Sequence, residues 1–150
     1  MTNYFNIGDV VSNQEICDQF KCSPQGGMRR SLRTGTLVII AKKGLYQNRW
    51  DGDILYYTGM GQRSDQNLDV CQNKTLANSR SNGVEIHLFE ALYPKEYTYR
   101  GIMELIADPF YEYQQDCDGT LRKVCVFPLR RKTLCQSTAS STPEKSEINL

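Results

Sequence analysis

The residues best suited to binding chemistry lie between positions 46 and 61, in the sequence YQNRWDGDILYYTGMG. This stretch holds three tyrosines, one tryptophan and two aspartates, and it ends in a glycine-rich Y-T-G-x-G segment. Aromatic faces can stack on a flat polar ring, and carboxylate or amide groups can hydrogen-bond to the edge of that ring. The stretch therefore predicts an aromatic-lined pocket for a flat polar ligand.

Other potential chemistry in the chain is weak. None of the six cysteines forms a C-x-x-C pair, and their spacing matches no common zinc pattern, so we expect reduced thiols and no metal or cofactor. His87 is the only histidine, which argues against zinc chemistry and His-dependent nuclease chemistry; in a strand it is expected to be structural. Asp51-Gly52-Asp53 lacks the remaining ligands of a calcium loop and is expected to be a turn.

Charge is distributed unevenly, although the net charge of the chain is only +1. Residues 1–49 and 119–135 are basic, whereas residues 50–118 are acidic. If the fold brings the two basic segments together, they form one face that binds phosphates; a solvated surface without a partner is the alternative. Met28, Arg29 and Arg30 follow a glycine-containing loop and predict either a DNA-touching finger or an ordinary exposed loop.

The elements that must position these residues are mostly short strands. Ser12 and Glu15 form a capping-box pattern before a short helix, and 73–79 fits a second one. A turn at 116–119 connects to a returning strand, and Gly101 marks a possible bulge. Strands are predicted at 36–41, 54–57, 84–88, 97–107 and 122–129. We therefore expect a mainly β (α+β) fold, a curved and partly closed barrel with two or so short helices.

Length and composition predict one domain over residues 1–135, because 150 residues suffice for a single core. From 136 to 150 the chain is rich in Ser, Thr, Pro and Glu without periodicity, which predicts a disordered tail or linker. No segment approaches the roughly 20 apolar residues of a membrane span, and the N-terminus does not resemble a signal peptide. We expect a cytoplasmic protein, associated with the nucleoid if bacterial.

Five blocks of sequence between residues 40 and 132 follow one order. They are the run from Tyr46 to Gly61, the Asn73-Lys74 pair, the Asn78–Leu88 segment, Tyr99-Arg100-Gly101-Ile102, and Val126-Phe127-Pro128-Leu129-Arg130-Arg131. In this order the blocks resemble SRA domains, which read modified cytosine in DNA. The variant D-G-D-I-L-Y-Y-T-G-M-G-Q with a later H-L-F-E is most similar to the SRA-like domains of bacterial McrA-type HNH restriction endonucleases.

The resemblance implies a PUA-like barrel that flips one base out of duplex DNA and holds it between Tyr46 and Tyr57. It implies a non-catalytic reader of 5-methylcytosine or another modified base, with a nuclease on another chain as a possible partner. The expected pocket comprises Tyr46, Asn48, Arg49, Trp50, Asp51, Tyr57, Thr58 and Gly59. The expected DNA contacts are Met28, Arg29, Arg30, Arg63, Asn73, Lys74 and Arg80.

One position departs from the family pattern. The pocket aspartate of the family usually lies three residues after the first tyrosine, where this chain has Arg49. An arginine donates hydrogen bonds but cannot accept them. Either Asp51 supplies the acceptor from a shifted turn, which we favour, or the preferred base is not 5-methylcytosine. Hydroxymethylated, glucosylated and other modified bases remain open.

Two other functions are compatible with the sequence. Asp65, Asp69, Glu85 and Glu90 could form a magnesium-dependent nuclease or another nucleic-acid-processing site, although no H-N-H motif is present. An RNA- or protein-binding PUA-like domain is the other alternative, because one fold serves many functions.

Overall fold

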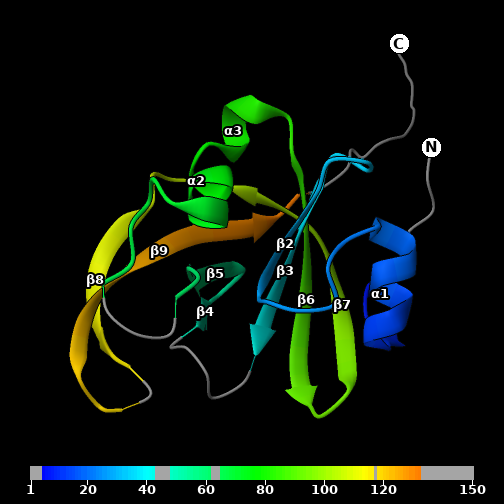
Figure 1. The fold of residues 1–150 in the computed structure, drawn as a ribbon, viewed down its shortest axis with the longest axis horizontal. Helices are drawn as coiled ribbons and strands as arrows, with labels where there is room; N and C mark the ends of the chain where they lie inside the picture. The colour runs from blue at the N-terminus through cyan, green and yellow to red at the C-terminus, as the bar shows by residue number, and fades with distance from the viewer. Residues whose placement is uncertain (1–4, 43–47, 62–64, 117, 133–150) are drawn as a thin grey trace.

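A computed structural model describes residues 5–42, 48–61, 65–116 and 118–132, and Figure 1 shows how their elements are arranged. The three helices are α1 (Asn13–Phe20), α2 (Cys71–Ala77) and α3 (Ser79–Asn82). The nine strands are β1 (Val10–Val11), β2 (Met28–Ser31), β3 (Thr36–Lys42), β4 (Arg49–Asp51), β5 (Ile54–Thr58), β6 (Glu85–Tyr93), β7 (Glu96–Leu105), β8 (Phe110–Gln115) and β9 (Leu121–Arg131).

All nine strands belong to one curved sheet. Its main path runs β2-β3-β6-β7-β9-β5-β4, with β1 added beside β7 and β8 beside β9. The pairing of β3 with β6 is parallel, and every other pairing is antiparallel. Because β2 and β4 end the path without pairing to each other, the sheet is curved but not closed (Figure 1). The predicted mainly β, partly closed barrel is confirmed.

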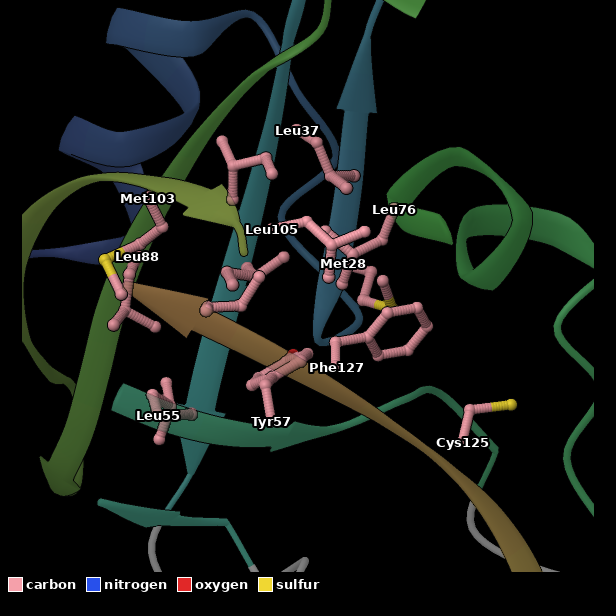
Figure 2. Close-up of a cluster of buried hydrophobic side chains, with 14 residues drawn as sticks. Met28, Leu37, Leu55, Tyr57, Leu76, Leu88, Met103, Leu105, Cys125 and Phe127 are labelled. Atoms are coloured by element: carbon pink, nitrogen blue, oxygen red, sulfur yellow. The ribbon is translucent and has the colours of Figure 1, made fainter. Parts of the chain in front are cut away.

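The interior of the sheet holds the main hydrophobic core. Strand β3 contributes to both faces because its continuous apolar run, predicted to be buried, alternates sides: Leu37 and Ile39 point inward, whereas Val38 and Ile40 point outward. Helix α2 covers the inner cluster with Leu76. Figure 2 shows this inner cluster, in which side chains from β3, β5, β6, β7 and β9 meet.

Helix α1 covers the outer face of β3, β6 and β7. The predicted capping box is present: the Ser12 hydroxyl accepts the Glu15 N–H at 3.1 Å, and the Glu15 carboxylate accepts the Ser12 N–H at 2.9 Å. The helix then buries Ile16 and Phe20 against the outer cluster. Within the described residues, no helix has the length and apolar character needed to cross a membrane.

Several elements differ from the sequence prediction. The exposed basic loop expected at Met28–Arg30 is wrong, because these residues form β2 and pair with β3. Strands β1, β4 and β8 were not predicted, since they are short or exposed and lack a continuous apolar run. Strand β6 extends five residues beyond its predicted end at Leu88 and forms a hairpin with β7. The second predicted helix is present, with α3 following it.

Candidate nucleic-acid interface

The β4–β5 hairpin presents different residues on its two faces. Its register pairs Arg49 with Tyr56 and Trp50 with Leu55. Successive strand residues point to opposite sides of a sheet, so Trp50 shares the face of the buried Leu55, whereas Arg49 and Asp51 share the opposite face with Tyr56. The acceptor predicted from Asp51 is therefore on the wrong side of the hairpin to act beside Tyr57.

Tyr57 lies within the hydrophobic core. Its side chain is 2% exposed, and Figure 2 shows its ring among Leu55 and Phe127. Its hydroxyl lies 3.0 Å from the carbonyl oxygens of both Gly27 and Ile40 and donates to this pair. The Tyr57 ring, predicted to line a base pocket, is thus held in place by backbone carbonyls and is covered in this structure. Tyr46, its expected partner, lies outside the described residues.

Asn48 lies next to the Thr58 backbone. The Asn48 Oδ1 atom accepts the Thr58 N–H at 2.7 Å. The Nδ2 atom of the same amide is buried and has no hydrogen-bond partner among the described residues. A buried donor without an acceptor is costly, and most buried polar groups in proteins are paired. Among the described residues of the predicted pocket, Asn48 therefore has a buried side-chain donor that lacks an acceptor.

Arg49 is engaged away from this region. It makes two hydrogen bonds of 3.0 Å to the Glu112 carboxylate of β8, and its guanidinium lies 5.1 Å from the centre of the Tyr56 ring. The hydrogen bond from Arg49 lowers the pKa of Glu112, which stays ionised at neutral pH. The structure thus gives Arg49, which was predicted to line the base pocket, a role in joining β4 to β8.

Trp50 connects the hairpin to the end of β6. Its indole N–H donates to Glu90 Oε2 at 3.1 Å, and Arg100 Nε donates to Glu90 Oε1 at 2.6 Å. The Trp50 side chain is still 42% exposed, so part of its ring remains open to a ligand. Sequence patterns gave no indication of this Trp50–Glu90–Arg100 network, because Trp50 and Glu90 are 40 positions apart in the chain.

The glycine turn after β5 is fixed from the inside by Asn73 of α2. The Asn73 amide accepts the Met60 N–H at 2.8 Å and donates to the Met60 carbonyl at 3.2 Å. A Cβ atom on Gly59 would lie 2.5 Å from Asn73 Oδ1, so this close approach requires glycine. Gln66 donates from the other side to the carbonyls of Gly59 and Gly61. Asn73, which was predicted to contact DNA, is 2% exposed, and its amide binds this turn.

The remaining predicted DNA contacts have varied environments. Met28 is part of the inner core, and Arg30 donates to the carbonyls of Ser31 and Thr36. Arg80 pairs with Asp108, whereas Lys74 is exposed on α2. Arg29 is buried, and Arg63 lies outside the described residues.

Two lysines of the basic segments lie at opposite ends of β6. Lys42 lies beside Ala91 near the end of β6, whereas Lys132 lies beside Ile102 and borders the hollow at the start of β6.

The alternative acidic site does not form within the described part of the chain. Asp65 accepts the Lys123 N–H, Glu90 binds Trp50 and Arg100, and Glu85 contacts His87. Across the described residues, no group of three or more His, Cys, Asp and Glu side chains could hold a metal ion. His87 is buried between Tyr99 and Glu85, at 2.8 Å from each; burial lowers its pKa below the usual 6.5, although Glu85 opposes this shift.

Solved structures with a similar fold include SRA domains bound to DNA. One is the "Sulfur binding domain and SRA domain of ScoMcrA complexed with phosphorothioated DNA", with a TM-score of 0.70 and 17% identity, covering 85% of this chain and 40% of that one. Another is the SUVH5 SRA domain in complex with hemimethylated CG DNA, with a TM-score of 0.64 and 25% identity, covering 88% and 92% of the two chains. KRYPTONITE in complex with mCHH DNA matches at 0.63 and 20% identity, over 85% and 32%.

Sequence comparison agrees with the fold. No curated protein matches this chain. The chain spans about two fifths of the ScoMcrA chain to which it is similar, and nearly all of the SUVH5 domain. The family model described as "ScoMcrA-like, SRA domain" matches residues 7–144, which is most of the sequence. This chain therefore belongs to the ScoMcrA-like SRA domain family.

Proposed function

We propose that this chain is a non-catalytic recognition module that binds duplex DNA carrying a modified base. The observation that carries the proposal is that the structural match covers nearly the whole SUVH5 SRA domain, which was solved with hemimethylated DNA. A modified cytosine is the base we favour, taken out of the helix and held on the Tyr57 side of the β4–β5 hairpin. A nuclease of a restriction system, on another chain or another part of a longer one, would act on the bound DNA.

Tyr57 is the ring on which we propose that the base stacks. Its hydroxyl donates to the Gly27 and Ile40 carbonyls, so the ring is already fixed before a ligand binds. Because the ring is covered, the base can reach it only after neighbouring residues move aside. Flipping a base costs a few kcal/mol of stacking and pairing, and stacking on an aromatic ring returns about 1–3 kcal/mol.

Asn48 replaces Asp51 as the residue we propose to read the edge of the base. Its Oδ1 atom is engaged by Thr58, which orients the amide, and its buried Nδ2 atom lacks an acceptor among the described residues. Cytosine carries an acceptor, the ring N3, on its Watson–Crick edge. A hydrogen bond from Nδ2 to this atom would satisfy both groups, and a lost partner at such a site costs about 1–3 kcal/mol.

A panel of matched duplexes tests the proposal. Each duplex carries one central cytosine that is unmodified, methylated, hydroxymethylated or glucosylated, and an RNA duplex of the same sequence is the control for RNA recognition. We expect one modified DNA duplex to bind at least about tenfold more tightly than the unmodified one, a difference of about 1.4 kcal/mol. We also expect no cleavage of that duplex with Mg²⁺. Equal binding of all DNA duplexes, or preference for RNA, would overturn the proposal.

A further inference from the structure

A groove lies on the outer face of the sheet, on the side of β3 opposite the inner core. One wall is the 24–27 segment, the other is the end of β6 with the turn to β7 at 92–95, and Ile40 and Tyr97 lie between them. Its volume is about 680 Å³. We call it the Arg29 groove, because the Arg29 side chain lines it from β2.

Arg29 is a buried cation with no carboxylate partner in the described part of the chain. Only 5% of the residue is exposed, and its side chain donates to the Gly26 carbonyl at 2.8 Å and to Asn13 Oδ1 at 2.6 Å. It also lies close enough to the Cys22 thiol to act against the effect of burial on the pKa of that thiol. Among the described residues, none of the ion pairs includes Arg29. Buried charges are normally paired with an opposite charge, so this guanidinium favours a bound anion.

Two further cations line the same groove from separate strands. Lys42 is exposed at the end of β3, and Lys95 is exposed at the turn between β6 and β7. Tyr93 and Tyr97 add hydroxyl groups from the hairpin. None of the described residues that line the groove is acidic, although the chain as a whole carries 17 Asp and Glu residues against 18 Lys and Arg. The groove is thus selectively cationic within a nearly neutral protein.

The walls of the Arg29 groove are the same segments that hold Tyr57. The carbonyls of Gly27 and Ile40, which accept from the Tyr57 hydroxyl on the inner side, belong to residues that line the groove on the outer side. At the other wall, Glu90 binds Trp50 and Arg100 immediately before the β6–β7 turn. The groove and the region proposed to hold the base therefore lie on opposite faces of the sheet, near the same end of β3.

We propose that the Arg29 groove binds a phosphodiester of the DNA strand that passes over this end of β3. The inference rests on the proposed function. A phosphate group matches the fork of an arginine and the point charges of two lysines. Such contacts position DNA without reading its sequence.

The test is the salt dependence of DNA binding by the double variant Lys42→Gln/Lys95→Asn. Asparagine at 95 removes the charge and tolerates the left-handed backbone, where φ is 64°. The slope of log K against log salt should fall by about two, because each phosphate contact contributes roughly 0.9. The matched control is Arg33→Gln, which removes an exposed charge in the turn at the opposite end of β3 and should keep the wild-type slope. A double variant whose slope equals that of Arg33→Gln would overturn the inference.

Arg29→Met is the second variant, and it separates phosphate binding from a structural role. We expect a folded protein by circular dichroism whose slope falls by about one. A lower melting temperature with an unchanged slope would show that Arg29 is only structural. Both experiments are run on modified and unmodified duplexes. The groove variants should weaken both equally, so the preference for modified DNA is unchanged. A wild-type protein without that preference would instead contradict the proposed function.

Discussion

The Oδ1 atom of Asn48 accepts the backbone N–H of Thr58 at 2.7 Å, and this bond fixes the direction in which the Asn48 amide points. The Nδ2 atom is buried without a partner in the described part of the chain. The oxygen of this amide thus joins the residue before β4 to the end of β5, and its nitrogen is a buried donor that is unsatisfied among the described residues. Both consequences can be tested by substitution.

Asn48→Ala should lower the free energy of unfolding by about 1–3 kcal/mol, because the Thr58 N–H loses its acceptor. Asn48→Asp keeps that acceptor but replaces the Nδ2 donor with an oxygen. We expect Asn48→Asp to retain more stability than Asn48→Ala and to change which modified duplex is preferred. Urea unfolding and the duplex panel measure the two effects. If both variants have wild-type stability and wild-type preference, Asn48 has neither role.

Tyr57 offers a matched pair of substitutions. Tyr57→Phe removes the hydrogen bonds to Gly27 and Ile40 but keeps the ring, so it should cost about 0.5–1.5 kcal/mol of stability and leave the preference for modified DNA intact. Tyr57→Ala removes a core ring and should cost about 3–5 kcal/mol. Thermal unfolding with and without DNA separates the cases. Loss of the preference in a folded Tyr57→Phe protein would show that the hydroxyl, rather than the ring, is what the ligand needs.

Asn73 and Lys74 are adjacent but should behave in opposite ways. Asn73→Ala leaves the Met60 N–H and carbonyl without partners and should lower stability by about 1–3 kcal/mol. Lys74→Ala removes an exposed charge, so it should keep stability and reduce the salt slope of DNA binding by about one. Denaturation and salt titration of both variants provide the check. A stable Asn73→Ala protein would contradict the role we assign to this amide.

His87 should make stability depend on pH near neutrality. Its pKa in the folded protein is below 6.5, so the unfolded chain binds this proton first as the pH falls. Stability from neutral His87 is complete above about pH 6.5 and decreases below it, by at most about 1.4 kcal/mol per pH unit. Since it is the only histidine, His87→Gln should flatten the profile between pH 5.5 and 7.5. An equally steep profile in that variant would assign the effect to other groups.

Much of the scaffold was predictable because local chemistry specifies it. The capping box at Ser12 and the apolar run of β3 gave correct elements, since each signal depends on neighbouring residues. The predicted bulge at Gly101 is confirmed: the β6–β7 register shifts between Leu88 and Phe89, and Gly101 adopts a φ of 104°. Glycine at such a position avoids the strain of a left-handed backbone.

The site was harder to predict because it depends on register and on distant partners. Two tyrosines are adjacent in β5, and only the pairing with β4 and β9 determines that Tyr57, not Tyr56, faces the core. A shift of one residue would exchange them. Likewise, Glu112 lies 63 residues from Arg49, so the sequence does not show that this arginine is already paired.

Pro128 shows the same limit within the scaffold. It lies inside β9, opposite Tyr56 of β5. On its other side the pairing with β8 ends at Val126, and the pairing with β7 begins at Leu129. The missing N–H therefore falls where the ladder is already interrupted, a relationship that only the assembled sheet reveals.

The most direct test of the central claim is the fluorescence of 2-aminopurine placed next to the modified cytosine in a duplex. If the modified base leaves the stack, its neighbour loses a stacking partner, and the 2-aminopurine signal should rise as the protein saturates the duplex. The same duplex with unmodified cytosine should show little change. Saturating binding of the modified duplex with no rise in fluorescence would contradict the account.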